Sequence, residues 1–262
     1  MTDISKYGFG TPGEPTQGAG AIALLVAKNP DLFWVDTALN GIFSKDVFDF
    51  WRPTGHRVPI VDGHYSIDCY LMALEGSVSH FRSNAKISKG EVLNYLDYII
   101  YHMPFPKMAY KAHQHLIEIE YENSSSVEKK NILKSSFAKM VEPGLLGARE
   151  VGNIYTGSVY MGLVSLLEKE RANVAGKKVG IFSYGSGCGA EFLICRINKN
   201  IINLINSLNF KKQLEDRKKL TNEQYANFYS KSNEETIFHE EEAKGFKNDF
   251  TRFVFTGFKA HK

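Results

Sequence analysis

Thiols, net charge and long apolar runs are all scarce in this 262-residue sequence. Its three cysteines, Cys69, Cys188 and Cys195, form no CxxC pair, so no disulfide framework is indicated and a reducing, cytoplasmic location is expected. A net charge of +3 with no basic tract of interleaved aromatics argues against nucleic-acid binding. No apolar run reaches the roughly 18 residues of a membrane span, and the polar, Gly/Pro-rich start lacks the apolar core of a signal peptide.

What is present is the composition of a globular chain. Hydrophobic residues make up 43% and charged residues 23% of the sequence, which is enough to bury a sizeable core. The length allows one large domain or two small ones. There is no internal repeat.

The segment from Tyr101 to His113 is the one around which the rest is organised. A strand-like run over 95–101 ends at His102, and a Pro-Phe-Pro loop stops it because proline cannot donate to a sheet ladder. In the helix-compatible segment that follows, Lys107 and Lys111 are four residues apart and share a face. A histidine beside two aligned lysines suits a site for an anionic acyl carrier. The alternative is a buried, satisfied histidine and a solvated lysine face.

Near the start, residues 17–27 change from small residues to a continuous apolar run, which predicts a buried central strand. A turn signal at 29–31 and the apolar run 32–35 predict the returning strand of a hairpin. Such a hairpin needs neighbouring strands, either from later residues or from another polypeptide.

Further elements follow from local patterns. Residues 43–63 read as a long loop ordered by packing. An apolar stripe predicts a helix over 65–82, and Ser88 to Glu91 predicts a capping box for a short helix. Residues 118–140 are helical in character, with a break at 123–126. Beyond about residue 199 the chain is polar, with a charged helix face at 211–219, a helix start at 221–224 and a closing strand at 253–257.

Two turns carry candidate ligand-binding groups. Asn153 precedes a predicted helix over 158–168, where free amide donors and the positive dipole end could hold a carbonyl oxygen or an anion; the alternative is a helix cap. A strand over 177–183 runs into the turn from Gly185 to Gly189, which includes Ser186. That turn is not a dinucleotide fingerprint, a phosphate-binding P-loop or a hydrolase elbow, because the required spacings are missing.

Five ordered motifs together resemble a known family. They are GEPTQGAGAIA (13–23), DVFDFWRPTGHRVPIVDG (46–63), YHMPFPKMAYKAH (101–113), VGNIYTGSVY (151–160) and FSYGSGCGAEF (182–192). The chain resembles the C-terminal portion of a 3-hydroxy-3-methylglutaryl-CoA synthase of the thiolase superfamily. This implies an α/β, thiolase-like fold layered αβαβα. It also implies a single domain over 1–262, in which residues 1–35 end the first half and residues 36–262 form the second.

The resemblance implies an acyltransferase of isoprenoid or polyketide biosynthesis. Its reaction joins an acetyl group, held as a thioester on a cysteine, to the β-carbonyl of an acetoacyl thioester. His102 matches the catalytic histidine that polarises the acceptor, and Asn153 and Ser186 match residues that line the acceptor pocket. A developing alkoxide needs such preorganised donors.

The remaining matched positions concern binding. Lys107 and Lys111 fall where the family binds the phosphates of coenzyme A, since a diphosphate needs cations. Tyr155 and Asp49 match substrate-binding positions near the pocket. Acetyl-CoA and acetoacetyl-CoA act as substrates, and no cofactor or metal is implied.

The sequence departs from the family pattern at its start. In the family the acyl-accepting cysteine and the general-base glutamate lie upstream of the GEPTQGAGA motif, and only 12 residues precede Gly13 here. Cys188 lies close to the predicted pocket, but the family has no nucleophile at its position, and Cys69 and Cys195 read as small buried residues. The chain alone is therefore expected to lack the nucleophile for covalent catalysis and to be inactive.

Three accounts of this departure stay open: a two-chain enzyme, a truncated product or fragment, and a non-catalytic binding subunit. The retention of His102, Asn153 and Ser186 favours the first two. The expected partners are a first-half chain, a second copy of this chain in a dimer, or both. Two motifs also resemble the branch of the family that installs β-branches on polyketides and takes its acyl groups from acyl carrier proteins. A pantetheine arm is common to both carriers.

Overall fold

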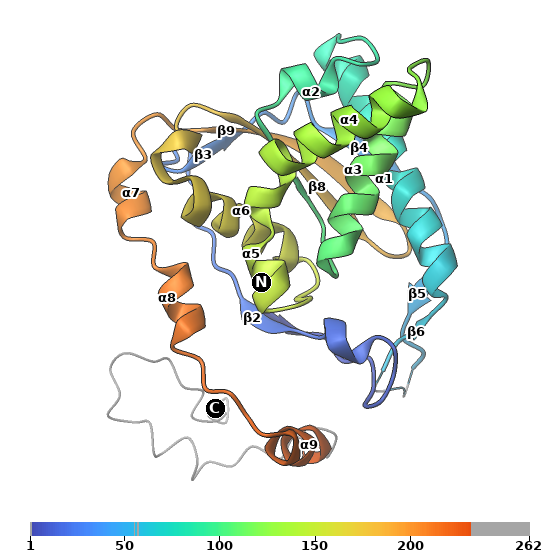
Figure 1. Ribbon diagram of the computed structural model, residues 1–262, viewed down its shortest axis with the longest axis vertical. Helices are drawn as coiled ribbons and strands as arrows, with labels where there is room; N and C mark the ends of the chain where they lie inside the picture. Colours follow the sequence, from blue (N-terminus) through green and yellow to red (C-terminus); the bar gives the residue numbers. More distant parts are fainter. Residues whose placement is uncertain (1, 55, 57, 232–262) are drawn as a thin grey trace, which may run out of the picture. The chain divides into compact units, whose positions relative to one another are not determined.

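The computed structural model describes residues 2–54, 56 and 58–231 (Figure 1). Contacts within the chain divide it after Arg217, so residues up to 217 form one compact unit. Of the second unit, only 218–231 are described, including helix α9 (Asn222–Lys231), close to the helix start expected at 221–224. The expected strand at 253–257 lies outside the described residues, and the expected single domain with a division at residue 35 stays a prediction.

A mixed sheet forms the centre of the first unit. Its strand order is β3 (Phe33–Val35), β9 (Gly189–Ile197), β8 (Lys178–Gly185) and β7 (Tyr98–Tyr101), and β4 (Gly41–Ser44) also pairs with β9. β8 and β9 form an antiparallel hairpin, whereas β7 runs parallel to β8. The long strand β9 accommodates β3 and β4 one after the other along the same edge.

Helices cover both faces of this sheet. α1 (Gly63–Ala85) and α3 (Pro106–Glu120) pack side by side on one face, and α6 (Gly157–Glu170) packs on the other (Figure 1). The side chains of β7 contribute alternately to the two cores, since successive side chains of a strand point to opposite faces. Ile99 and Tyr101 enter the core with α1 and α3, while Tyr98 and Ile100 enter the core with α6. All four residues of β7 are buried.

Shorter elements connect these layers. The remaining strands form two small ribbons, β1 (Thr2–Ile4) with β2 (Ala19–Ala21) and β5 (Phe50–Trp51) with β6 (Ile60–Val61). The remaining helices are α2 (Val92–Tyr95), α4 (Ser126–Ser136), α5 (Leu146–Glu150), α7 (Ile202–Asn206) and α8 (Phe210–Glu215). Single helical turns are η1 (Glu14–Thr16), the π-helical η2 (Phe137–Val141), η3 (Glu142–Gly144) and η4 (Arg171–Val174). Among the described residues, no helix is both long and apolar enough to cross a membrane.

The predicted buried hairpin near the start is wrong. Only 19–21 form a strand, β2, which pairs with β1, while β3 pairs with β9. The apolar run continues without regular structure, and Leu25 and Val26 are 94% and 93% exposed. The physical reason is the lack of strand neighbours: in the described part of the chain β2 has a single partner strand, and the run that follows it is in no sheet.

Most helix and strand predictions are confirmed with shifted ends. The expected helices at 65–82 and 158–168 are α1 and α6, and the helix after the Pro-Phe-Pro loop is α3, with Pro106 in its first turn. The strand predicted over 95–101 is shorter, because Tyr95 ends α2 and residues 96–97 connect that helix to β7. The predicted loop over 43–63 contains the end of β4 and the β5–β6 ribbon.

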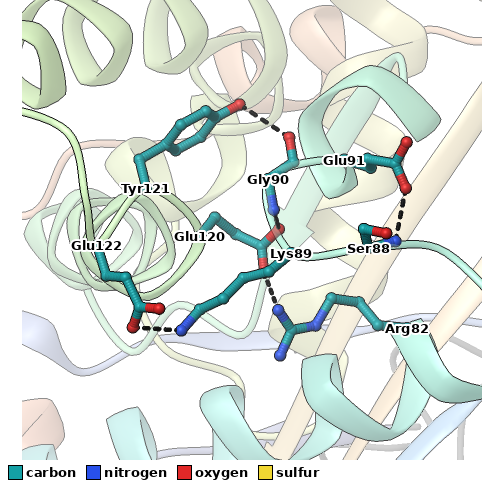
Figure 2. Close-up of polar contacts among 8 residues, drawn as sticks. All are labelled: Arg82, Ser88, Lys89, Gly90, Glu91, Glu120, Tyr121 and Glu122. Atoms are coloured by element: carbon teal, nitrogen blue, oxygen red, sulfur yellow. Dashed lines mark hydrogen bonds and ion pairs between the residues drawn. The ribbon is translucent and has the colours of Figure 1, made fainter.

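A polar cluster joins the far ends of α1 and α3 (Figure 2). Arg82 Nη1 lies 3.1 Å from Oε1 of Glu120, whose side chain is fully buried, and the Gly90 N–H donates to Glu120 Oε2 at 2.8 Å. The predicted capping box is half formed: the Glu91 carboxylate accepts from the Ser88 N–H, but Glu91 itself is the N-cap of α2. The cluster fixes how α1 and α3 pack at the end away from their first turns.

Candidate functional site

A cavity of about 920 Å³ lies at the N-terminal ends of α1 and α3. Its walls come from the 7–16 segment, the β5–β6 ribbon, the first turns of α1, the loop after β7, the residues before α6, and the β8–β9 turn. Segments more than 140 residues apart in sequence therefore meet here, for example at the Asn153 to Tyr7 hydrogen bond. Four predicted site residues line it: His102, Asn153, Tyr155 and Ser186.

His102 enters the cavity from the end of β7. Its N–H donates to the Phe182 carbonyl at 2.7 Å, and its carbonyl accepts from the Tyr70 hydroxyl at 2.8 Å, so the backbone is held from both sides. The side chain is 9% exposed, and its Nδ1 has no hydrogen-bond partner among the described residues. Burial lowers the pKa of His102 to about 4, which keeps the imidazole neutral near pH 7.

Asn153 is buried just ahead of α6. Its Oδ1 accepts from the Tyr155 N–H at 2.9 Å and from Ser158 Oγ at 3.0 Å, while its Nδ2 donates to the Tyr7 hydroxyl. The N-cap of α6 is Thr156, so Asn153 organises the approach to the helix and does not cap it. Its amide is thereby held rigidly in the cavity wall.

An aromatic group closes one side of the cavity. Tyr7, Phe50 and Tyr155 meet edge to face, with ring centroids 6.2 to 6.5 Å apart. Tyr155 has φ of 51°, an unusual value for a bulky residue, and this turns its ring toward the other two. Burial raises the pKa of both tyrosines, so both hydroxyls keep their protons near neutral pH. Sequence reasoning missed Tyr7, because nothing local to a Lys-Tyr-Gly segment indicates its contact with Asn153.

Asp49 lies behind the cavity wall and not in it. The side chain is fully buried and accepts three hydrogen bonds, from the Tyr184 hydroxyl at 2.9 Å, Ser66 Oγ at 3.0 Å and the Gly187 N–H at 2.9 Å. All three donors belong to the protein, so Asp49 positions the residues around it, and its predicted substrate contact stays a prediction. Asp49 fixes the β8–β9 turn, in which Ser186 is exposed at the cavity.

Lys107 and Lys111 lie outside the cavity lining. Both are exposed on the first turns of α3, and Met108, between them in sequence, faces inward and lines the cavity. The two ammonium groups are thus placed one helical turn apart on the solvent side of a cavity-lining helix.

No cysteine is among the described residues that line this cavity. All three thiols are buried, and burial raises the pKa of each. Cys188 instead lines a smaller recess of about 540 Å³ beside the β8–β9 turn, together with Lys45. Across the described residues there is no group of three or more histidine, cysteine or acidic side chains suited to a metal ion.

The arrangement suits the binding of a polar carbonyl group. A neutral imidazole, a fixed amide and a hydroxyl face one partly apolar cavity, and such donors stabilise negative charge that develops on oxygen. The exposed lysines offer charge for an anionic group outside the cavity.

Comparison with known proteins identifies the family. Residues 33–139 and 122–252 match the family described as Hydroxymethylglutaryl-coenzyme A synthase C terminal. The hydroxymethylglutaryl-CoA synthase of Enterococcus faecalis is 41% identical over 192 residues, which cover 72% of this chain and 46% of that protein. That of Gibberella zeae is 32% identical over 264 residues, covering 85% and 58%.

A solved structure titled MvaS in complex with 3-hydroxy-3-methylglutaryl coenzyme A aligns with a TM-score of 0.80 and 39% identity, covering 87% of this chain and 58% of that one. These matches confirm the thiolase-like fold and place the chain in the second part of it. The chain spans about half the length of the curated relatives it matches. It belongs to the hydroxymethylglutaryl-CoA synthase family and corresponds to the C-terminal part of its members.

Proposed function

We propose that this chain supplies the acceptor pocket of a condensing enzyme that joins an acetyl group to the β-carbonyl of an acetoacyl thioester. The observation that carries the proposal is the meeting of His102, Asn153 and Ser186 in one cavity. In this proposal His102 is catalytic: as a neutral donor it polarises the β-carbonyl and stabilises the alkoxide that forms there. Asn153 and Ser186 orient the same substrate, and Tyr155 closes the pocket around it.

The thiol and the base of the reaction come, in this proposal, from a first-half polypeptide segment. The three thiols of this chain are poor candidates, because burial raises the pKa of each and disfavours the thiolate nucleophile. The chain alone is then inactive. No cofactor takes part, since the thioesters are themselves the substrates.

The exposed apolar run after β2 supports such a partner. Leu24, Leu25 and Val26 are 40%, 94% and 93% exposed, which is an association-prone surface. We expect the isolated chain to associate with a first-half chain or with itself. Sedimentation of the chain alone and after co-expression tests this, and a monodisperse monomer that gains no partner would contradict it.

Calorimetric titration with acetoacetyl-CoA tests the pocket directly. Binding should weaken about tenfold or more in His102→Ala, because a buried donor to the carbonyl is lost. His115→Ala is the matched control: it is also a histidine, on α3, but it pairs with Glu75 and does not line the cavity. Equal affinities of both variants for acetoacetyl-CoA would contradict the proposed role of His102.

Transfer of a labelled acetyl group tests whether the partner carries the acetyl group while this chain supports condensation. The lone chain should take up no label from acetyl-CoA, whereas with a first-half partner it should support condensation. His102→Ala should then abolish condensation but spare acetylation of the partner. Stoichiometric acetylation of the lone chain at Cys188 would overturn this account.

The carrier of the acyl group has two candidates, coenzyme A and an acyl carrier protein. Both occur among the solved relatives. MvaS is titled as a complex with 3-hydroxy-3-methylglutaryl coenzyme A, and the curacin-pathway synthase is titled as a complex with apo donor-ACP. The curacin-pathway synthase is 29% identical, with a TM-score of 0.77 over 88% of this chain and 55% of that one. We favour coenzyme A. The Lys107 and Lys111 ammonium groups, one turn apart, suit a diphosphate, and their attraction to it is screened by salt.

Alanine substitutions separate these carriers. If coenzyme A binds, Lys107→Ala and Lys111→Ala should each raise its Kd several-fold, with a smaller effect at high salt. Lys130→Ala on α4, which is also exposed, is the control and should change nothing. If a carrier protein binds, free coenzyme A should bind poorly and the same two variants should weaken carrier docking. Unchanged affinity for both carriers would assign these lysines a structural role only.

A further inference from the structure

A mostly buried network of hydrogen bonds joins β7, α3 and α4. Tyr101 and His113 are both 0% exposed, and the Tyr101 hydroxyl lies 2.9 Å from His113 Nδ1. On the other side of the ring, His113 Nε2 lies 2.7 Å from Ser136 Oγ. Ser136 Oγ also lies 2.6 Å from the Ile132 carbonyl oxygen. This network of hydrogen bonds therefore links strand β7 to helices α3 and α4 through an apolar core.

The positions of the hydrogen atoms in this network can be worked out from the Ile132 carbonyl at its end. The Ser136 hydroxyl donates its single hydrogen to the Ile132 carbonyl, which also accepts from the Ser135 hydroxyl. Ser136 Oγ then accepts from His113, whose ring proton must lie on Nε2. His113 Nδ1 is left as an acceptor, and Tyr101 donates to it. Burial lowers the pKa of His113 to about 4, which agrees with a neutral ring.

The hydrogen-bond network connects the two ends of the segment that carries His102. Tyr101 is the last residue of β7 and directly precedes His102, whereas His113 lies two turns into α3. The connection between them contributes His102, Phe105 and Met108 to the cavity. The Tyr101 to His113 hydrogen bond therefore ties together the two ends of this part of the cavity wall.

This tie matters because the His102 ring has little polar support of its own. Its Nδ1 has no hydrogen-bond partner within the described part of the chain, and its other hydrogen bonds are made by the backbone. The orientation of the ring then depends on how firmly β7 and α3 are held beside it. Imprecise support of a site residue is costly, since small displacements weaken every contact that it makes.

We propose that His113, held between Tyr101 and Ser136, is a positioning residue that sets the placement of His102 in the cavity. It touches no substrate. It acts through Tyr101, the neighbour of His102 in sequence, and through the start of α3. The placement itself is a property of the free chain, and only its effect on ligand binding rests on the proposed function.

Nuclear magnetic resonance of the full chain with 15N-labelled histidine tests the network without any ligand. Ring correlations should show His113 with its proton on Nε2 between pH 5 and 8. Ser136→Ala removes the acceptor of that proton, so the His113 signals should change, and the His102 ring signals should shift with them. Ser135→Ala is the matched control: it is the adjacent residue, it is exposed, and its hydroxyl binds the Asn131 and Ile132 carbonyls. It should move neither histidine.

A second variant guards against local effects of one substitution. Tyr101→Phe should shift both rings, whereas Tyr121→Phe at the other end of α3, which removes a hydroxyl bonded to the Gly90 carbonyl, should not. If acetoacetyl-CoA binds the parent chain, Ser136→Ala should weaken it about 3- to 10-fold. Failure of the parent to bind would count against the proposed function alone. A His113 proton on Nδ1, or His102 signals that move no more than in the Ser135→Ala control, would overturn the positioning role.

Discussion

Removal of the Arg82 side chain should destabilise the chain strongly, although it lies far from the cavity in the cluster of Figure 2. Arg82→Met keeps most of the aliphatic volume but takes the cation away from Glu120. The Glu120 side chain is fully buried, and that of Arg82 is 17% exposed. The remaining polar support of the carboxylate is the Gly90 N–H on Oε2. The 3.1 Å contact of Arg82 with Oε1 is an ion pair without good hydrogen-bond alignment, so charge supplies most of its effect.

The magnitude follows from burial. Breaking a buried ion pair by removing one partner costs about 3–5 kcal/mol, because the other charge is left uncompensated. Lys89→Met is the matched control, since it removes the neighbouring pair with Glu122, in which the two side chains are 40% and 55% exposed. An exposed pair of this kind is worth about 0–1 kcal/mol. The two variants therefore differ in expected cost by about 2–5 kcal/mol.

Urea denaturation followed by circular dichroism measures the free energy of unfolding of each variant. The double variant Arg82→Met with Glu120→Met should recover most of the loss, because it removes both charges and leaves apolar volume. A cost no larger than that of Lys89→Met, or no recovery in the double variant, would refute the reasoning.

Three further predictions follow from the site and the sheet. Burial lowers the pKa of both His102 and His113 to about 4, so the unfolded chain binds more protons than the folded one between about pH 4 and 6.5. The free energy of unfolding, measured by denaturant titration, should therefore fall as pH falls through that window, by at most about 2.7 kcal/mol per pH unit. Asp49→Asn should cost about 1–3 kcal/mol and weaken acetoacetyl-CoA binding, because an amide cannot accept from all three donors; unchanged stability and affinity would contradict its role in holding the turn. Gly41→Ala should cost about 1–3 kcal/mol or more in thermal or urea unfolding, since the added Cβ would lie 1.9 Å from the Ser77 carbonyl oxygen and force β4 away from α1.

Local chemistry in the sequence was sufficient for the elements around the site. The Pro-Phe-Pro loop ends a strand and starts a helix for reasons contained in those residues, so His102 and the lysine face of α3 could be placed from sequence. The alternating Gly-rich turn after residue 183 predicted the end of a strand but left open whether a strand or a helix follows; the structure shows the strand β9, antiparallel to β8. The five motifs predicted the family, and the comparisons confirm it.

Only the tertiary structure decided which of these residues meet. Asn153 and Tyr7 are 146 residues apart, and no local pattern predicts their hydrogen bond. Asp49 has the residue type of a substrate ligand, but the sequence did not show that three donors from distant segments bind its carboxylate. The apolar run through Leu25 has the sequence of a buried strand, yet it is exposed. The physical reason is common to all: the pattern of a segment states what it can bury or bind, whereas its neighbours in space determine what it does bury or bind.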